Sequence, residues 1–278
     1  MTQIRIIPKL DIKNGFLIKG INLDGLRILG DPNDFALNYY NNNADEIIYL
    51  DSVATLYGTN NLVKFIKKTA KNIFIPLIVG GGIRSIKDIE KTLENGADRV
   101  ALNSAVVDDI KLLKKSAKLF GSSTITITIE AIKYDNKYYV SKSSGRDTVK
   151  IDPKEWAKEV EDNGAGEILL TSVNKEGLKL GFDLKLSEQI SSSLSIPVIA
   201  HGGAGKFEDV YKVINYSNIS GVAISGLFHY DVARLFKFKS KNAIGNVEFL
   251  QNLENKKYRN NLLNLKKFLF KKGIDVRL

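Results

Sequence analysis

The sequence predicts an α/β fold in which eight parallel strands alternate with helices and close into a single barrel. Two observations support this prediction. Short apolar segments of strand length alternate with helical patterns along the chain, and the first half of the pattern recurs in the second half. Strand–helix alternation favours a parallel sheet, and eight such units favour its closure. A doubly wound open sheet is the alternative, but a repeat of half a domain favours the closed form.

The expected strands are short apolar runs, and a segment with helical spacing follows each of them. The strands lie near residues 4–10, 45–50, 74–79, 97–102, 123–130, 166–171, 196–201 and 220–225. The helices lie near residues 32–43, 60–71, 85–95, 107–118, 153–163, 183–193, 206–215 and 260–272. The long loop after the fifth strand, residues 133–150, is typical of a small hairpin.

One apolar strand ends in three glycines, and the chain contains a second copy of it. PLIVGGGIR begins at Pro76 and PVIAHGGAGK begins at Pro197, an offset of 121 residues. Three more pairs of segments repeat at nearly this offset and in the same order: IRIIPKLDIK with TITITIEAIK, ADEIIYLDS with AGEILLTSV, and VALNSAV with VAISGLF. Chance rarely repeats four segments in one order. The pattern therefore indicates an internal duplication with a period much longer than that of a solenoid.

We expect one domain over residues 1–278, with half-barrels at about 1–120 and 121–278. No Pro/Ser-rich linker divides the chain, and 278 residues with 44% hydrophobic content can bury a large core. An insertion at about 238–259 precedes the last helix.

Composition argues against several classes of function. No apolar run approaches the ~18 residues of a membrane span, and the first residues lack the apolar region of a signal peptide. The chain has no cysteine, which excludes disulfides and is typical of a cytoplasmic protein, and its two histidines leave little for a metal centre. The net charge of +10 is spread along the chain without a nucleic-acid module. We expect no nucleic acid and no membrane as partners, whereas a phosphorylated substrate suits this charge.

Two carboxylates mark the expected catalytic end of the barrel. Catalytic groups of such barrels lie at the carboxyl ends of the strands. Asp11 and Glu130 end the first and fifth strands, which the repeat relates, so they would face each other across the mouth. Opposed carboxylates suit general acid–base catalysis if their surroundings separate their pKa values. A pair of solvated acids at loop starts is the alternative.

Two glycine-rich strand ends predict two phosphate sites, near residues 80–82 and 202–203. Glycine lets backbone N–H groups approach an anion closely, and the N-terminus of the next helix favours an anion there. One such strand end often makes only a turn. Two ends related by the repeat predict a substrate with a phosphate at each end.

Strand parity predicts a charged ring at the opposite end of the barrel. Residues two apart share a face of a strand, so Arg5 points the same way as Asp11. By register, Glu46, Arg99 and Glu167 lie near the N-terminal ends of strands two, four and six, and with Arg5 they would form an inward ring of two positive and two negative charges. Buried charges persist only when they are paired. Ordinary surface ion pairs are the alternative.

Several motifs resemble the cyclase subunit of imidazole glycerol phosphate synthase. They are PKLDIKNGFLIKG, GDP at residues 30–32, YLDS, VGGGIRS, NGADRVALNSA, NGAGEILLTSVNKEG, AHGGAGK and the closing GIDVRL. The resemblance covers nearly the whole chain except the insertion at about 242–259. The resemblance implies a (βα)8 TIM barrel of two similar halves. It also implies a heterodimer, in which a glutaminase docks at the N-terminal face and supplies ammonia.

The reaction that the resemblance implies splits and cyclises a bis-phosphorylated ribulosyl aminoimidazole carboxamide intermediate. Its products are imidazole glycerol phosphate, for histidine biosynthesis, and aminoimidazole carboxamide ribotide. No metal or organic cofactor is implied.

Roles follow for the matching residues. Asp11 and Glu130 stand at the two catalytic positions. Substrate and phosphate binding is implied for Lys19, Gly81, Gly82, Asn103, Ser104, Thr171, Glu176, Gly202, Gly203 and Ser225. An ammonia gate is implied for Arg5, Glu46, Arg99 and Glu167, with Arg99 where Lys is usual, and Asp98 matches an acid at the glutaminase interface.

The chain departs from the family pattern near the reactive end. Glu130 and Glu176 each replace Asp, and misplacement of about 1 Å can cost ~100-fold in rate. His201 stands where a small residue is expected, and would contact a phosphate or pack in the mouth. Lys9 replaces a small residue between the gate and Asp11, where it would pair with Asp11 or Glu130 and narrow the ammonia path.

These departures keep two other functions open. One is a divergent paralogue that docks a glutaminase and passes ammonia to another enzyme, for example in amidino-sugar or surface polysaccharide biosynthesis. The other is a non-enzymatic ammonia conduit. Retained phosphate sites and an intact gate favour the cyclase. The isomerase barrel one step earlier in the pathway shares the fold and phosphate sites, but NGAGEILLTSVNKEG and the gate residues fit the cyclase better.

Overall fold

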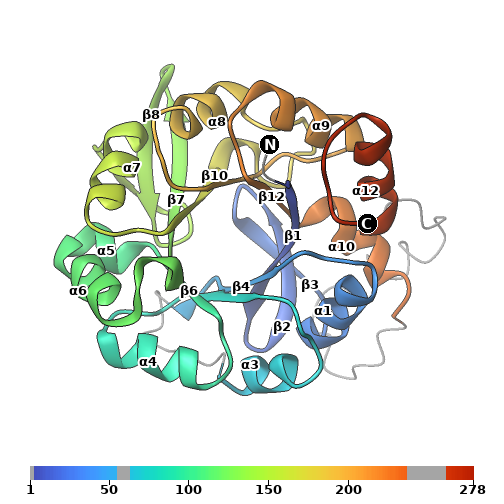
Figure 1. The fold of residues 1–278 in the computed structure, drawn as a ribbon, viewed down its shortest axis with the longest axis horizontal. Coiled ribbons are helices and arrows are strands. Elements are labelled where there is room, and N and C mark those ends of the chain that lie inside the picture. Colours follow the sequence, from blue (N-terminus) through green and yellow to red (C-terminus); the bar gives the residue numbers. More distant parts are fainter. Residues whose placement is uncertain (1–2, 55–62, 237–260) are drawn as a thin grey trace.

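A closed barrel of eight parallel strands forms the centre of the protein, with helices around it (Figure 1). The computed structural model describes residues 3–54, 63–236 and 261–278. The barrel strands are β1 (Arg5–Lys13), β4 (Ile47–Asp51), β5 (Leu77–Gly80), β6 (Arg99–Leu102), β7 (Ile125–Tyr134), β10 (Glu167–Ser172), β11 (Val198–His201) and β12 (Gly221–Ile224). Each pairs in parallel with the next, and β12 pairs with β1 to close the ring. The predicted closed barrel is confirmed, and the alternative prediction of a doubly wound open sheet is wrong.

Helices follow the strands as predicted, with two differences. They are α1 (Pro32–Asn41), α3 (Val63–Ala70), α4 (Ile86–Glu94), α5 (Ser104–Asp108), α6 (Ile110–Phe120), α7 (Pro153–Asp162), α8 (Leu184–Ser191), α9 (Phe207–Tyr216), α10 (Gly226–Ala233) and α12 (Leu262–Lys271), with short 3-10 turns η1 (Ser122–Thr124) and η2 (Val173–Lys175). The helix expected at 107–118 is divided, because the Asp109 carboxylate accepts a bond from the Lys111 N–H and starts α6 there. Helix α10 was not predicted, because its residues are mostly buried and it lacks a polar stripe.

The duplication extends to the way in which two helices begin. Asp31 precedes Pro32 at the start of α1, and its carboxylate accepts a bond of 2.8 Å from the Asn33 N–H. Asp152 and Pro153 start α7 in the same way. An acidic N-cap satisfies a free helix N–H, and proline suits the first helical position, where no N–H is needed.

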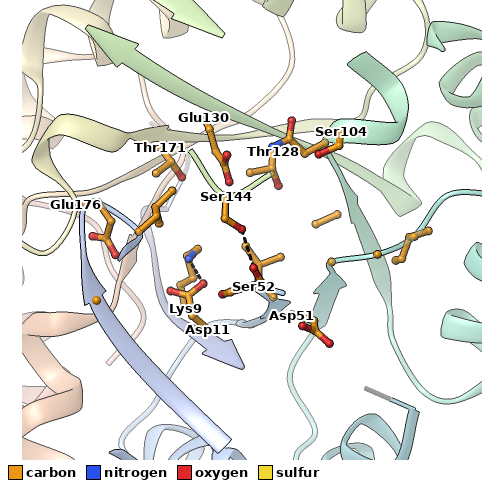
Figure 2. A pocket seen from close by; sticks show the side chains of 18 of the residues that line it. Lys9, Asp11, Asp51, Ser52, Ser104, Thr128, Glu130, Ser144, Thr171 and Glu176 are labelled. Atoms are coloured by element: carbon orange, nitrogen blue, oxygen red, sulfur yellow. Dashed lines mark hydrogen bonds and ion pairs between the residues drawn. The ribbon is translucent and has the colours of Figure 1, made fainter. Parts of the chain in front are cut away.

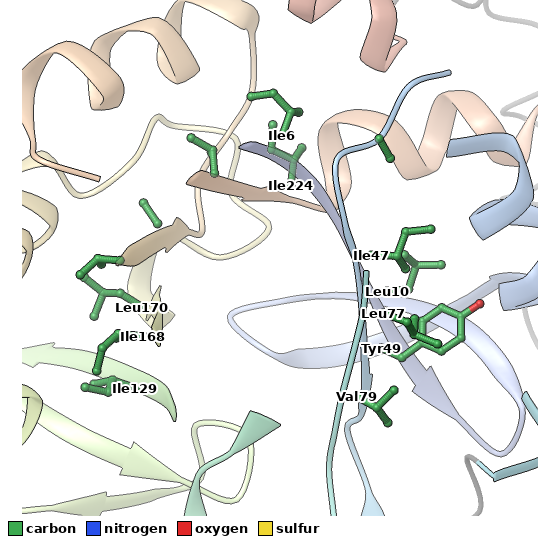
Figure 3. Close-up of a cluster of buried hydrophobic side chains, with 14 of the residues drawn as sticks. Ile6, Leu10, Ile47, Tyr49, Leu77, Val79, Ile129, Ile168, Leu170 and Ile224 are labelled. Carbon is green, nitrogen blue, oxygen red and sulfur yellow. The ribbon is translucent and has the colours of Figure 1, made fainter. Parts of the chain in front are cut away.

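Two apolar layers stabilise the barrel. The outer layer lies between the strands and the helices and includes Ile6, Tyr49 and Val79 (Figure 3). The inner layer fills the interior with Ile7, Ile48, Ile78, Ala101, Leu169, Ile199 and Ala223. Alternate strand residues face opposite sides, which is why neighbours such as Ile6 and Ile7 enter different layers.

A β-hairpin follows the first strand of each half. The predicted hairpin after β7 consists of β8 (Lys137–Lys142) and β9 (Asp147–Val149) and is confirmed. An unpredicted one, β2 (Phe16–Ile21) and β3 (Asp24–Gly30), follows β1. Asn14 and Gly15, both with positive φ, form the tight turn that joins β1 to β2, and this Asn-Gly pair was the sequence signal for the turn. The single domain and its half-barrel boundaries stay a prediction, and the insertion at about 238–259 lies outside the described residues.

Candidate active site

A cavity of about 680 Å³ opens at the carboxyl ends of the strands. It brings together Asp11, Lys19, Gly81, Gly82, Asn103, Ser104, Glu130, Thr171 and Glu176 from among the predicted site residues. Figure 2 shows Asp11, Glu130, Thr171 and Glu176 around this space. Gly202, Gly203 and Ser225 line a smaller cavity, which shares Glu176 with the first. Every residue predicted to bind substrate therefore borders one of two adjoining cavities.

Asp11 lies at the bottom of the main cavity as half of a buried ion pair. Its Oδ1 is 2.5 Å from Lys9 Nζ, and Lys9 and Asp11 are only 2% and 8% exposed. Both residues belong to β1 and face the interior. The sequence left Asp11 and Glu130 open as partners of Lys9, and the structure selects Asp11 (Figure 2).

Glu130 has different surroundings. The Gly145 N–H, in the turn between β8 and β9, donates a bond of 2.9 Å to Glu130 Oε2. Burial raises the pKa of Glu130 to about 7, against the lowering effects of this bond and of the Lys9 charge. One carboxyl of the pair thus has a lysine partner and the other gains or loses its proton near neutral pH. This asymmetry suits an acid and a base working together.

The raised pKa of Glu130 predicts a pH-dependent contribution to stability. Because the pKa is higher in the folded chain than the usual 4.5, folding favours the protonated form. The contribution is complete below about pH 4.5 and is lost as pH rises through about 7. We expect Glu130→Gln to gain up to about 3 kcal/mol in unfolding free energy relative to wild type between pH 4.5 and 8. Parallel denaturant titrations test this, and identical pH slopes for both proteins would contradict it.

A second buried cluster surrounds Glu176. Lys19 Nζ, from β2, lies 2.5 Å from Glu176 Oε1, and residues of the first hairpin line the main cavity. His201 Nδ1 is 3.1 Å from Thr171 Oγ1, and its Nε2 is 3.5 Å from Ser225 Oγ. Burial, followed by the charge of Lys9, lowers the pKa of His201 well below its usual value, so the ring is neutral. His201 thus packs among the residues of the predicted second phosphate site, and phosphate contact stays a prediction.

The glycine-rich strand ends need glycine for steric reasons. Gly81 has φ +97°, and a Cβ there would lie 2.4 Å from the Asp51 carbonyl oxygen. Gly203 has φ +105°, and a Cβ would lie 2.2 Å from the Gly181 oxygen. The repeat also appears in the next strands, because Asn103 and Ser225 start α5 and α10 with nearly the same backbone angles. At both strand ends, therefore, backbone groups without a covering side chain border the cavities.

The predicted charged ring is present at the opposite end of the barrel. Arg5 lies 2.9 Å from Glu46 and 2.6 Å from Glu167, and Arg99 approaches the same two carboxylates at 3.4 and 3.1 Å. Glu46 and Glu167 are only 4% and 5% exposed, so the alternative interpretation, that these residues form ordinary surface ion pairs, is wrong. Burial raises the pKa of Glu167, and the Arg5 charge counteracts that rise. Asp98 is exposed at the same end and accepts a bond of 2.8 Å from the Leu77 N–H.

The hairpin after β7 supplies contacts that the sequence did not predict. Besides the bond from Gly145 to Glu130, Ser144 Oγ donates to the Ser52 carbonyl at 3.0 Å, and the Ser143 N–H donates to Ser104 Oγ at 3.1 Å. Residues 143–145 all have positive φ, so they form a tight turn that reaches across the mouth. The only sequence signal was their position in the long loop after a catalytic strand.

Within the described part of the chain, no three His, Asp or Glu side chains gather closely enough to hold a metal ion. None of the described helices has the length and apolar composition of a bilayer span.

Comparison with known proteins identifies the family. Residues 5–234 match the family described as "Histidine biosynthesis protein". The chain is 50% identical to the imidazole glycerol phosphate synthase subunit HisF of Legionella pneumophila over 210 residues, which are 75% of this chain and 99% of the relative. Identity to HisF of Sulfurisphaera tokodaii is 40% over the full length of both chains, and to HisF of Bacillus cereus strain G9842 it is 44% over 89% of this chain and 99% of the relative. The resemblance predicted from the motifs is confirmed, and the chain belongs to the histidine biosynthesis family that contains the HisF subunits of imidazole glycerol phosphate synthase.

Proposed function

We propose that this protein is the ammonia-dependent cyclase of histidine biosynthesis. It splits and cyclises the bis-phosphorylated ribulosyl aminoimidazole carboxamide intermediate into imidazole glycerol phosphate and aminoimidazole carboxamide ribotide. The observation that carries the proposal is one cavity that brings together two carboxyls, Asp11 and Glu130, in different surroundings. Support also comes from the two related glycine-rich strand ends, one bordering each of the two adjoining cavities, which suits a substrate with a phosphate at each end.

The acid–base pair suits the chemistry of ammonia addition. When ammonia adds to a carbonyl, nitrogen must lose a proton and oxygen must gain one, and positioned acids and bases accelerate both transfers. Asp11, paired with Lys9, is the proposed base, and Glu130 is the proposed acid. Lys19 and Glu176 would contact the substrate from above, and Thr171 from the side.

A glutaminase subunit at the N-terminal face is the proposed source of ammonia. The relatives are named as subunits of a synthase, which supports an assembly of more than one chain. The charged ring lies at this face and leads to the apolar inner layer, through which a small neutral molecule could pass. Phe74, 79% exposed, and Asp98 both line one surface depression at this end and suit a docking contact. A cytoplasmic location stays a prediction.

Turnover of the bis-phosphorylated intermediate by the purified chain tests the proposal. The assay contains excess ammonium salt at alkaline pH and no glutaminase, and imidazole glycerol phosphate is the expected product. Tight binding without product would contradict the cyclase. It would favour the paralogue that passes ammonia elsewhere, which the full-length match to HisF subunits does not favour.

A further inference from the structure

Lys9 occupies the boundary between the barrel interior and the active-site cavity. It lies on the inward face of β1, between Ile7 of the inner apolar layer and Asp11 at the cavity floor. An isolated ammonium is costly to bury, and the Asp11 carboxylate at 2.5 Å compensates this charge. The pair therefore stands where substrate and ammonia would meet.

The backbone of Lys9 is held by a separate polar network. Its carbonyl accepts a bond of 2.7 Å from Ser225 Oγ and lies 2.8 Å from His229 Nε2. His229 Nδ1 lies 2.6 Å from the Tyr39 hydroxyl. A carbonyl can only accept, so Nε2 carries the proton and Nδ1 accepts from Tyr39. The backbone pairing between β1 and β12 ends at Pro8, which lies opposite Ile224. The Ser225 side chain then holds the next residue of β1 by its bond to the Lys9 carbonyl. These bonds fix the backbone position from which the Lys9 side chain extends.

We propose that Lys9 is a positioning residue for the acid–base pair: its ammonium holds Asp11 as an oriented carboxylate and leaves Glu130 as the carboxyl that carries the exchangeable proton. This inference rests on the proposed function. In the reaction, Asp11 would take one proton from nitrogen and Glu130 would give one to oxygen. The pair returns to its starting state when Asp11 releases its proton to water and Glu130 takes one back.

The charges around the pair agree with this division. Lys9 lowers the pKa of Glu130, whereas Asp11 raises it, so the two members act on Glu130 in opposite directions. Within the described part of the chain, most of the other titratable or charged groups around this cavity have partners of their own or are neutral. Lys19 and Glu176 pair with each other, Asp51 accepts bonds from the N–H groups of residues 53 and 54, and His201 and His229 are neutral. Asp108 pairs with Lys142 at the rim, Arg84 donates to the Ala54 carbonyl, and Arg146 acts on Glu130. The Arg146 charge adds to the lowering effect of Lys9 on the pKa of Glu130.

A carboxyl titration of the free protein tests the proposal without relying on turnover. The Glu130 signal is followed by carbon NMR of protein labelled at glutamate carboxyls and assigned by its loss in Glu130→Gln. Lys9→Met should move its midpoint upward from about 7 by roughly one pH unit, and Asp11→Asn should move it downward. Lys19→Met, which removes an equally buried lysine with its own carboxylate partner, should leave it unchanged. An unmoved midpoint in Lys9→Met, or shifts of the same sign in Lys9→Met and Asp11→Asn, would overturn the proposal.

Kinetics provide the second readout. In the ammonium assay, Lys9→Met should lower kcat by about 10- to 100-fold, leave KM for the intermediate nearly unchanged, and move the pH–rate limb of Glu130 in the direction seen by NMR. An unchanged pH profile would contradict the positioning role. If Lys9→Met does not fold, adding it to Asp11→Asn removes the whole ion pair, and this double variant should titrate above the single Asp11→Asn. Absent turnover in wild type would refute the proposed function, while the NMR titration would still decide the role of Lys9.

Discussion

Asp11→Asn should reduce ammonium-dependent turnover by about 100- to 10,000-fold, the range that positioned acid–base groups contribute. Asparagine keeps the shape of the side chain, but it cannot accept a proton from nitrogen at neutral pH. It also leaves the Lys9 ammonium, only 2% exposed, without its carboxylate partner. The measurement is kcat with saturating intermediate and ammonium at several pH values, because the loss should persist across the whole range.

Asp108→Asn is a matched control for this result. Asp108 also borders the cavity, but its side chain is 59% exposed and pairs with Lys142 at the rim. Exposed pairs contribute little, so we expect turnover within about twofold of wild type. Activity of Asp11→Asn close to that of the control would exclude Asp11 as the base.

The positions of the charged residues could be predicted because strand geometry leaves little freedom. Once β1 is known to face the interior at Arg5, parity places Asp11 on the same face. Glu46 and Glu167 begin their strands at the same end of the barrel as Arg5, and they contact it. The half-domain repeat added which strand ends oppose each other. These features depend on backbone regularity and hardly on side-chain detail.

Contacts made by loops could not be predicted in the same way. The Gly145 N–H reaches Glu130 only because three successive residues with positive φ turn the hairpin toward the cavity. The choice of Asp11 over Glu130 as the partner of Lys9 depends on a few ångströms within the barrel. Helix α10 could not be predicted because it is buried on most sides, so its sequence lacks the alternation of polar and apolar faces that marks a surface helix. Tertiary packing decides each of these features, and no local pattern encodes it.

Arg5→Met should lower the free energy of unfolding by about 2–4 kcal/mol. Arg5 bridges two buried glutamates, and its loss leaves both of them to Arg99, at 3.1 to 3.4 Å. Removing one partner of a buried ion pair costs about 3–5 kcal/mol, and we lower this figure because Arg5 itself is 21% exposed. Denaturant unfolding at neutral pH measures the change.

A double-mutant cycle separates a ring of coupled charges from four independent side chains. Adding Glu167→Gln to Arg5→Met leaves one glutamate and one arginine, so the charge is balanced again and about half of the lost stability should return. Because the ring lies far from Asp11 and Glu130, ammonium-dependent turnover should survive in Arg5→Met. If the ring controls entry of ammonia, glutamine-dependent turnover in the presence of glutaminase should fall in the same variant. Additive stability effects would mean that the four charges are not coupled, and an unchanged ratio of glutamine- to ammonium-dependent turnover would remove the gate from the proposed function.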